Sequence, residues 1–177
     1  MRVVTELDAG PMLATATRPI GPDDTSVEVE RDLAEIGARS LIEVVDRLAQ
    51  GPVVETPQDD RLATFAPKLE KSESPIDWGQ AARDIHNRVR GLQPWPMAST
   101  TIGGGRILIH RTQLTEDSVR ADGGAIVAAH GEVLSVAAGD GTVLRLLVIQ
   151  PEVRRAMTAR EFLSGHKLQP GMLLGRL

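Results

Sequence analysis

The chain has 177 residues, of which 41% are hydrophobic and 25% are charged, a composition typical of a folded protein with a packed core. It contains no cysteine, which excludes disulfide bonds and thiolate metal sites, and no run of about 18 apolar residues that could span a membrane. The first residues also lack the basic start and apolar block of a signal peptide. We therefore expect a cytoplasmic protein.

The net charge of −4 is unevenly divided along the chain. Residues 1–75 carry 8 Lys/Arg and 15 Asp/Glu, a net charge of −7, whereas residues 76–177 carry 12 and 9, a net charge of +3. This asymmetry indicates that the second half binds an anionic partner. Chance variation in the number of solvated charges would produce the same uneven distribution. With two Trp, two Phe and no Tyr, base stacking on aromatic side chains is poorly supported.

The first fifty residues read as a strand, a loop and a helix. Val3-Val4 resembles the end of a strand that runs into a loop over residues 7–11, and residues 12–20 alternate weakly, as a short strand or an extended arm does. Apolar residues at helical spacing then predict a helix over residues 26–50. A capping-box pattern begins it, with Thr25 followed three positions later by Glu28, and Gly51-Pro52 ends it.

A linker and a second helix follow. Residues 51–75 have no clear periodicity and contain several prolines, which predicts a linker. From Trp78 to Leu92 apolar residues repeat at helical spacing, with Asp77 as the expected N-cap. The helix should stop at Gln93-Pro94, because proline disfavours helical geometry in the residue before it.

From residue 98 onwards the pattern changes to short apolar runs separated by turn signals, at a spacing of roughly ten residues, which is typical of a small barrel or sandwich. The Gly103–Gly105 triplet is interpreted as a hairpin turn, since no helix follows it to make a phosphate cradle. Residues 157–165 predict a short helix capped by Thr158, and residues 166–174 predict a last strand. The chain is thus bipartite, with a part too small to fold alone ahead of a helix-plus-β unit of about 100 residues.

Few residues suggest chemistry. Asp8 follows the first predicted strand, where open α/β sheets place catalytic groups, but Asp and Gly also simply make turns. The four histidines show no metal-ligand spacing, so no metal site is expected. Cations lie in the linker, on the second helix and in the β region, where they suit a polyphosphate partner. The candidates for this binding are Lys68, Lys71, Arg83, Arg90, Arg154 and Arg155.

Five ordered segments carry a resemblance to a known family. They are ELDAGPML, PIGPDDTS, FAPKLEKSESPIDW, IHNRVRGLQPWPMA and MTAREFLSGHKLQPG, and they cover essentially the whole chain. Their order resembles that of methionyl-tRNA formyltransferases, with the I-D-W and P-W-P pieces the most specific. The family usually has Gly where Met97 stands.

The resemblance implies an α/β remnant of a Rossmann-like formyltransferase domain over residues 1–50, a linker over 51–75, and a C-terminal OB-like β-barrel domain with a leading helix over 76–177. It implies formyl transfer from 10-formyltetrahydrofolate to the amino group of initiator Met-tRNA, with no metal, no DNA and no membrane partner. Asp8 matches the family's catalytic aspartate, and Lys68 and Lys71 match linker lysines associated with tRNA contact.

The family's catalytic Asn and His belong to an N-I-H-x-S-L-L-P segment that this sequence does not contain. We therefore expect the chain to resemble the last three-fifths of the family, to lack most of the folate site and to be inactive alone. Two alternatives stay open, a stand-alone tRNA-binding fragment and a related formyltransferase that acts on an amino sugar or on folate.

Overall fold

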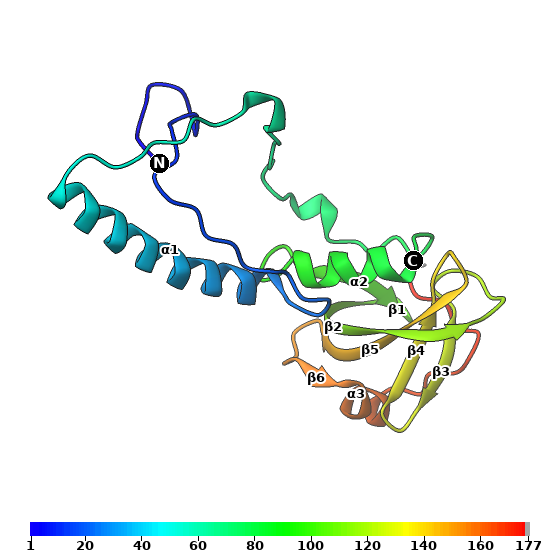
Figure 1. The fold of residues 1–177 in the computed structure, drawn as a ribbon. Helices are drawn as coiled ribbons and strands as arrows, with labels where there is room; N and C mark the ends of the chain where they lie inside the picture. Colours follow the sequence, from blue (N-terminus) through cyan, green and yellow to red (C-terminus); the bar gives the residue numbers. More distant parts are fainter. Residues whose placement is uncertain (176–177) are drawn as a thin grey trace. The chain divides into compact units, whose positions relative to one another are not determined.

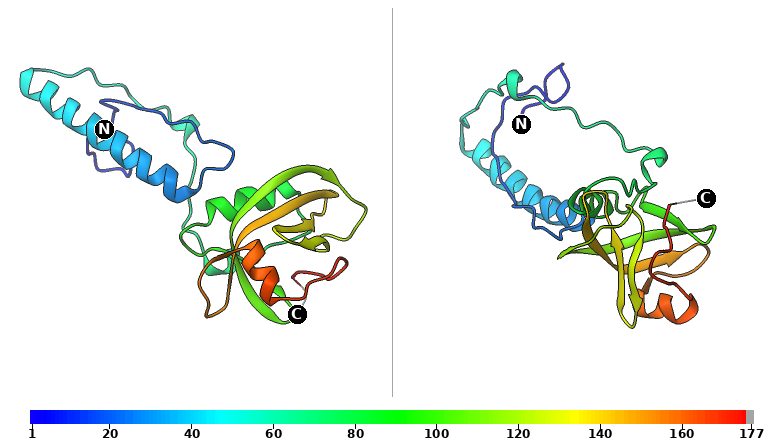
Figure 2. Two further views of the ribbon diagram at one scale, coloured as in Figure 1. Left: turned by 90° about the horizontal axis from the view of Figure 1, so that it is seen from below. Right: turned by 90° about the vertical axis from the view of Figure 1, so that its right-hand side faces the viewer.

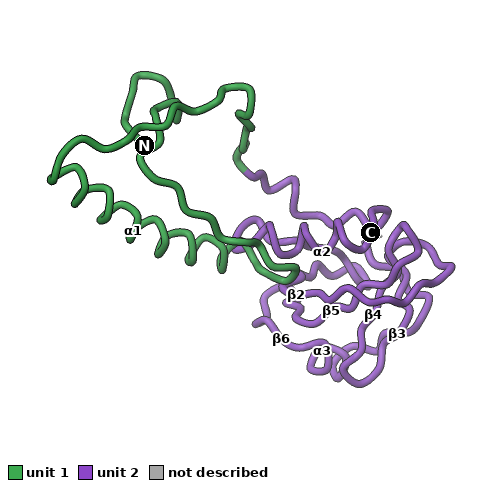
Figure 3. The backbone as a smooth tube through the Cα atoms, viewed as in Figure 1, with its two compact units in different colours: residues 1–68 green, residues 69–177 purple. Residues whose placement is uncertain are grey.

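The computed structural model describes residues 1–175, which divide into two compact units, Met1–Lys68 and Leu69–Leu177 (Figure 3). The last two residues of the predicted 76–177 domain lie outside the described residues. The division into segments 1–50, 51–75 and 76–177 remains a prediction. Each unit is described by itself below.

One long helix, α1 (Ser26–Gln50), dominates the first unit (Figure 1). The predicted capping box is present, since the Thr25 hydroxyl accepts a hydrogen bond from the Glu28 N–H and the Glu28 carboxylate accepts one from the Thr25 N–H. At the other end the Gly51 N–H donates to the Arg47 carbonyl. The predicted helix is confirmed at both ends, because local capping signals fix both.

The strand predicted at Val3-Val4 is wrong, and residues 12–20 form an extended arm and not a short strand, the two alternatives left open by the sequence. Both stretches are irregular or extended chain, and Val3 is 98% exposed. The first unit contains one isolated antiparallel bridge. In it, Met12 and Thr56 exchange backbone hydrogen bonds of 2.8 and 2.9 Å. An alternating sequence becomes a strand only where a neighbouring edge satisfies its backbone groups, and one bridge does not. A single 3-10 turn, η1 (Asp60–Leu62), follows.

The second unit is built on an antiparallel sheet of six strands (Figure 1). The strands are β1 (Ala98–Ile102), β2 (Gly105–Ser118), β3 (Ile126–His130), β4 (Val133–Ala137), β5 (Thr142–Pro151) and β6 (Met157–Thr158). They pair in the order β1-β2-β5-β4-β3, with β6 on β5. Four or five strands were predicted from the short apolar runs, and the Gly103-Gly104 turn joins β1 to β2 as expected.

The paired sheet is open between β1 and β3, so the closed barrel is not established by strand pairing. Irregular segments bind at these edges instead. Residues 74–76 pair with β1, with 2.7 Å hydrogen bonds from the Ile76 N–H to the Ser99 carbonyl and from the Ser99 N–H to the Ser74 carbonyl. The strand predicted over residues 166–174 is reduced to one bridge, Ala125 to Leu173.

Three short helical segments complete the second unit, η2 (Lys71–Glu73), α2 (Ala82–Gly91) and α3 (Ala159–Gly165). The start predicted for α2 is wrong, because Asp77 does not cap it. The Asp77 carboxylate accepts hydrogen bonds from the Gly79 N–H and the Gln80 side chain, and so makes a turn that delays the helix to Ala82. Thr158 caps α3 in a full capping box with Glu161, as predicted.

The core lies in the second unit, where α2 packs against β2 and β5, and α3 packs against β3, β4, β5 and β6 (Figure 2). Ile85 and Val89 of α2, Phe162 of α3 and Leu144 and Ile149 of β5 are fully buried there. Among residues 1–175, no helix is both long enough and apolar enough to cross a membrane.

Candidate nucleic-acid interface and the Asp8 loop

Asp8 lies in a turn at the start of the first unit, and its side chain is exposed. Its backbone has a φ of 54°, a left-handed conformation that Asp adopts more readily than most residues. The Gln58 amide fixes the loop by donating to the carbonyls of Asp8 and Gly10 at 2.6 and 2.8 Å. The loop therefore holds one carboxylate in a defined position facing solvent.

Gly10 is required by the same loop. A Cβ at this position would lie 1.9 Å from the Arg2 carbonyl oxygen, because the chain folds back there and the Arg2 N–H donates to the Pro11 carbonyl at 2.9 Å. The Arg2 side chain also forms an ion pair with Glu55 at 2.8 Å. The pattern Asp-Ala-Gly-Pro thus has a local structural reason beside any chemical one.

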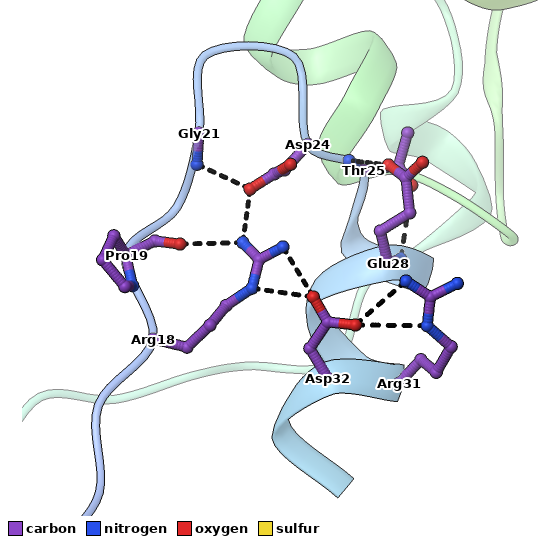
Figure 4. A network of polar contacts seen from close by, with 8 residues as sticks. All are labelled: Arg18, Pro19, Gly21, Asp24, Thr25, Glu28, Arg31 and Asp32. Atoms are coloured by element: carbon purple, nitrogen blue, oxygen red, sulfur yellow. Dashed lines mark hydrogen bonds and ion pairs between the residues drawn. The ribbon is translucent and has the colours of Figure 1, made fainter. Parts of the chain in front are cut away.

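An Arg-centred network ties the arm before α1 to the helix (Figure 4). The Arg18 guanidinium donates to Asp32 at 2.7 and 3.0 Å, to the Pro19 carbonyl at 2.8 Å and to Asp24. Asp32 also accepts hydrogen bonds from Arg31 at 2.9 and 3.1 Å. Hydrogen bonds from Arg18, and then from Arg31, lower the pKa of Asp32. Sequence reasoning missed this network, because nothing in the spacing from Arg18 to Asp32 signals a contact.

The two linker lysines fall on either side of the boundary between the units, Lys68 in the first and Lys71 in the second. Both side chains are exposed, and neither makes an ion pair with a residue among 1–175. Lys71 starts η2, whose Glu73 carbonyl accepts two hydrogen bonds from the Arg88 guanidinium of α2, one of them at 3.0 Å. Arg88 therefore fixes the end of the linker on α2.

Arg83 and Arg90 lie seven residues apart on α2, so they share one face of the helix. The buried residues Ile85 and Val89 define the opposite face. Asn87 lies between the two arginines and accepts a 2.9 Å hydrogen bond from the Arg90 Nε. The structure thus brings these two predicted residues together in one polar stripe, in which Arg83 is exposed and Arg90 is half-buried.

Arg154 and Arg155 lie in the loop between β5 and β6. Arg155 forms an ion pair with Glu161 of α3 at 2.6 Å, whereas the Arg154 guanidinium has no ion pair among the described residues. The Thr158 backbone N–H, followed by Arg155, lowers the pKa of Glu161. Val153, just before the pair, has a φ of 59°, an uncommon conformation for a β-branched residue.

The I-D-W segment has a structural role. The Trp78 indole is buried and donates a 3.0 Å hydrogen bond to the Thr100 hydroxyl of β1. Its backbone approaches Gly123 so closely that a Cβ there would lie 2.2 Å from the Trp78 carbonyl oxygen. The neighbouring Gly79 meets Gly139 in the same way, at 1.9 Å. Trp78 therefore locks the chain before α2 onto the sheet.

The P-W-P segment differs, because Trp95 is 55% exposed at the end of α2. Met97, two residues later, has a φ of 65°, a conformation that glycine adopts without strain. This explains why glycine suits the position at which Met97 stands.

The predicted site residues do not form one constellation. Asp8 and Lys68 belong to the first unit, whereas Lys71, the α2 pair and Arg154-Arg155 occupy three places on the second. No cluster of three or more potential metal ligands occurs among residues 1–175. The predicted site residues are therefore one acid, Asp8, and six cations that lie at separate places.

The C-terminal domain family of formyl transferases matches residues 68–167. Over the whole chain, the methionyl-tRNA formyltransferase of Nitrosococcus oceani is 38% identical, across 98% of this chain and 54% of its own length. That of Methylococcus capsulatus is 40% identical, across 95% of this chain and 54% of its own length. The chain spans about half the length of the curated relatives it matches.

Solved structures share the fold at low identity. HypX from Aquifex aeolicus in complex with tetrahydrofolic acid has a TM-score of 0.66 and 20% identity, over 90% of this chain and 28% of that one. The N-formyltransferase from Helicobacter canadensis in complex with folinic acid and dTDP-3-aminofucose has a TM-score of 0.63 and 14% identity, over 84% and 53%. These likenesses show the fold, and the match of residues 68–167 shows that the chain belongs to the formyl transferase family and contains its C-terminal domain.

Proposed function

We propose that this chain is part of a methionyl-tRNA formyltransferase, which transfers a formyl group from 10-formyltetrahydrofolate to the amino group of initiator Met-tRNA. The observation that carries the proposal is the 38–40% identity, along 95–98% of the chain, to relatives of that name. Because the chain spans about half of those relatives, the activity is proposed for the whole protein.

In this proposal the first unit is part of a Rossmann-like catalytic domain. The exposed apolar side chains of α1 support it, since Leu41, Ile42 and Val45 would be covered in a larger domain. The second unit is an OB-like barrel. Its support is the segment at residues 171–175, which binds the end of the sheet at β3 through Ile126 and the other edge through a 2.9 Å hydrogen bond from the Gly175 N–H to the Thr101 carbonyl.

Asp8 would act by accepting a hydrogen bond from a catalytic histidine and stabilising the charged form of its ring. All four histidines of this chain lie in the second unit, so the partner is expected from elsewhere in the whole protein. The hollow beside Asp8 is lined by the loop's own residues 1–8 and Gly10 and does not fit a folate by itself. We therefore propose no folate contact for the residues around Asp8.

The second unit would hold the tRNA through Lys71, Arg83, Arg90, Arg154 and Arg155, with Lys68 at the end of the first unit. Phosphate contacts by such cations give affinity without reading sequence. Replacing Lys68 and Lys71 together by Ala should weaken tRNA binding. An unchanged affinity would show that the linker only connects the two units.

The test of the activity joins the first half of the Methylococcus capsulatus relative to this chain. We expect the chimera to formylate initiator Met-tRNA, and the same chimera with Asp8→Asn to lose about 100-fold or more in rate. The chain alone should show no folate-dependent formylation. A folded chimera that formylates a dTDP-amino sugar but not Met-tRNA would favour the amino-sugar alternative, and formylation by the chain alone would contradict its expected inactivity.

A further inference from the structure

One arginine in the sheet of the second unit has a buried donor with no partner. The Arg145 Nε on β5 is inaccessible to solvent and makes no hydrogen bond with any described residue. Buried side-chain donors are nearly always paired, because an unpaired one keeps the desolvation penalty without a compensating hydrogen bond. Arg145 as a whole is only half-buried, so part of its side chain remains open to a ligand.

Arg145 lies on the face of the sheet that turns away from the core. Its neighbours on β5, Leu144 and Leu146, are fully buried in the core, and side chains alternate between the two faces of a strand. Directly opposite Arg145 stand Gln113 on β2 and Ser135 on β4. Residues opposite one another in an antiparallel sheet share a face, so the three form one polar row across three adjacent strands.

A second arginine lies on the strand next to Arg145. Arg111 is exposed two positions before Gln113 on the same strand. Farther along the β2–β5 pair, the His110 ring and the Gln150 amide form a hydrogen bond of 2.8 Å. The acidic residues of β2, Glu116 and Asp117, come only at the end of the strand, and Arg145 has no ion pair among the described residues.

We propose that the outer face of β2 and β5 binds a phosphate of the RNA backbone, with Arg145 as the principal cation and the Gln113 amide as a second donor. A guanidinium held on a sheet, with one donor already desolvated and no carboxylate beside it, suits a phosphate oxygen. This inference rests on the proposed function, because it names a contact for the tRNA. Arg145 is additional to the six cations assigned from the sequence.

The test compares Arg145→Met with the wild-type chain in binding initiator tRNA, measured by fluorescence anisotropy over a series of KCl concentrations. Methionine keeps an unbranched apolar stem and removes the charge. We expect an affinity several-fold lower at low salt, and a plot of log K against log salt whose slope is smaller by about 1. Arg145→Lys should retain part of both.

Two controls separate a binding role from a structural one. Arg39→Met removes one exposed charge from α1 in the first unit and should leave the slope unchanged. The thermal midpoint of the second unit in Arg145→Met should stay the same or rise, because an unpaired buried donor is lost. A lower midpoint with an unchanged salt slope would assign Arg145 to stability and overturn the inference.

The remaining outcomes are also decisive. If the wild-type chain binds tRNA and Arg145→Met binds equally well with the same slope, the phosphate contact is wrong while the proposed function stands. If the wild-type chain does not bind tRNA at low salt, the RNA-binding role proposed for the second unit fails, and this contact fails with it.

Discussion

The two units use their apolar residues in opposite ways. In the second unit these residues build a closed core around Ile85, Leu144 and Phe162. In the first unit Val44 is the one buried large hydrophobic residue, while Leu41 and Ile42 on the same helix are mostly exposed. A helix can thus have its ends fixed by caps while much of its apolar face stays exposed in its own unit, because capping is local and burial is not.

The largest effect should come from the core of the second unit. Phe162 is 1% exposed and stacks on His166 with ring centroids 4.1 Å apart. We expect Phe162→Ala to lower the free energy of unfolding by about 3–5 kcal/mol in urea titrations. Leu41→Ala, at a position 64% exposed on α1, should change it by less than about 0.5 kcal/mol. Equal losses would mean that the two units do not differ in burial.

A second contrast uses two glycines of the second unit. A Cβ at Gly139 would lie 1.9 Å from the Gly79 carbonyl oxygen, whereas one at Gly91 would meet nothing within 4 Å. Gly139→Ala should therefore cost about 1–3 kcal/mol of unfolding free energy, since the backbone must move. Gly91→Ala, at the end of α2, should be neutral or slightly stabilising. A tolerated Gly139→Ala would show that the I-D-W segment is not locked against the sheet.

The smallest effect concerns the arm before α1. Because the pKa of Asp32 is lowered in the folded state, its pairing with Arg18 contributes stability above the ordinary pKa of about 3.9 and loses it as the pH falls through the lower folded value. Chemical shifts of residues 18–24 should change in that acidic range and stay constant between about pH 5 and 8. In Asp32→Asn the arm should already be released at neutral pH. An arm that stays attached in this variant would contradict the role of the pair.

Local signals in the sequence predicted the helices and hairpins well. Thr25 with Glu28 and Thr158 with Glu161 marked the helix starts correctly, and the Gly103–Gly105 turn placed β1 and β2. The helix start predicted from Asp77 was wrong, because a residue that can cap a helix can also close a turn before it. The strand expected at Val3-Val4 failed because strands depend on partners distant in sequence.

The candidate site was less predictable than the fold. Sequence spacing could pair Arg83 with Arg90, because a helix repeats regularly, and the structure places both on one face of α2. It could not find the buried Nε of Arg145, because that depends on the register of three strands. It also could not find the contact of Arg18 with Asp32, which joins an irregular arm to a helix. The roles of Asp8 and of the six cations stay predictions.

The most direct test of the RNA-binding role of this chain is its affinity for initiator tRNA as a function of salt. We predict binding at low salt, with log K falling linearly against log salt at a slope of about −3 or steeper, as several phosphate contacts require. Binding that does not depend on salt, or no binding at low salt, would contradict the account.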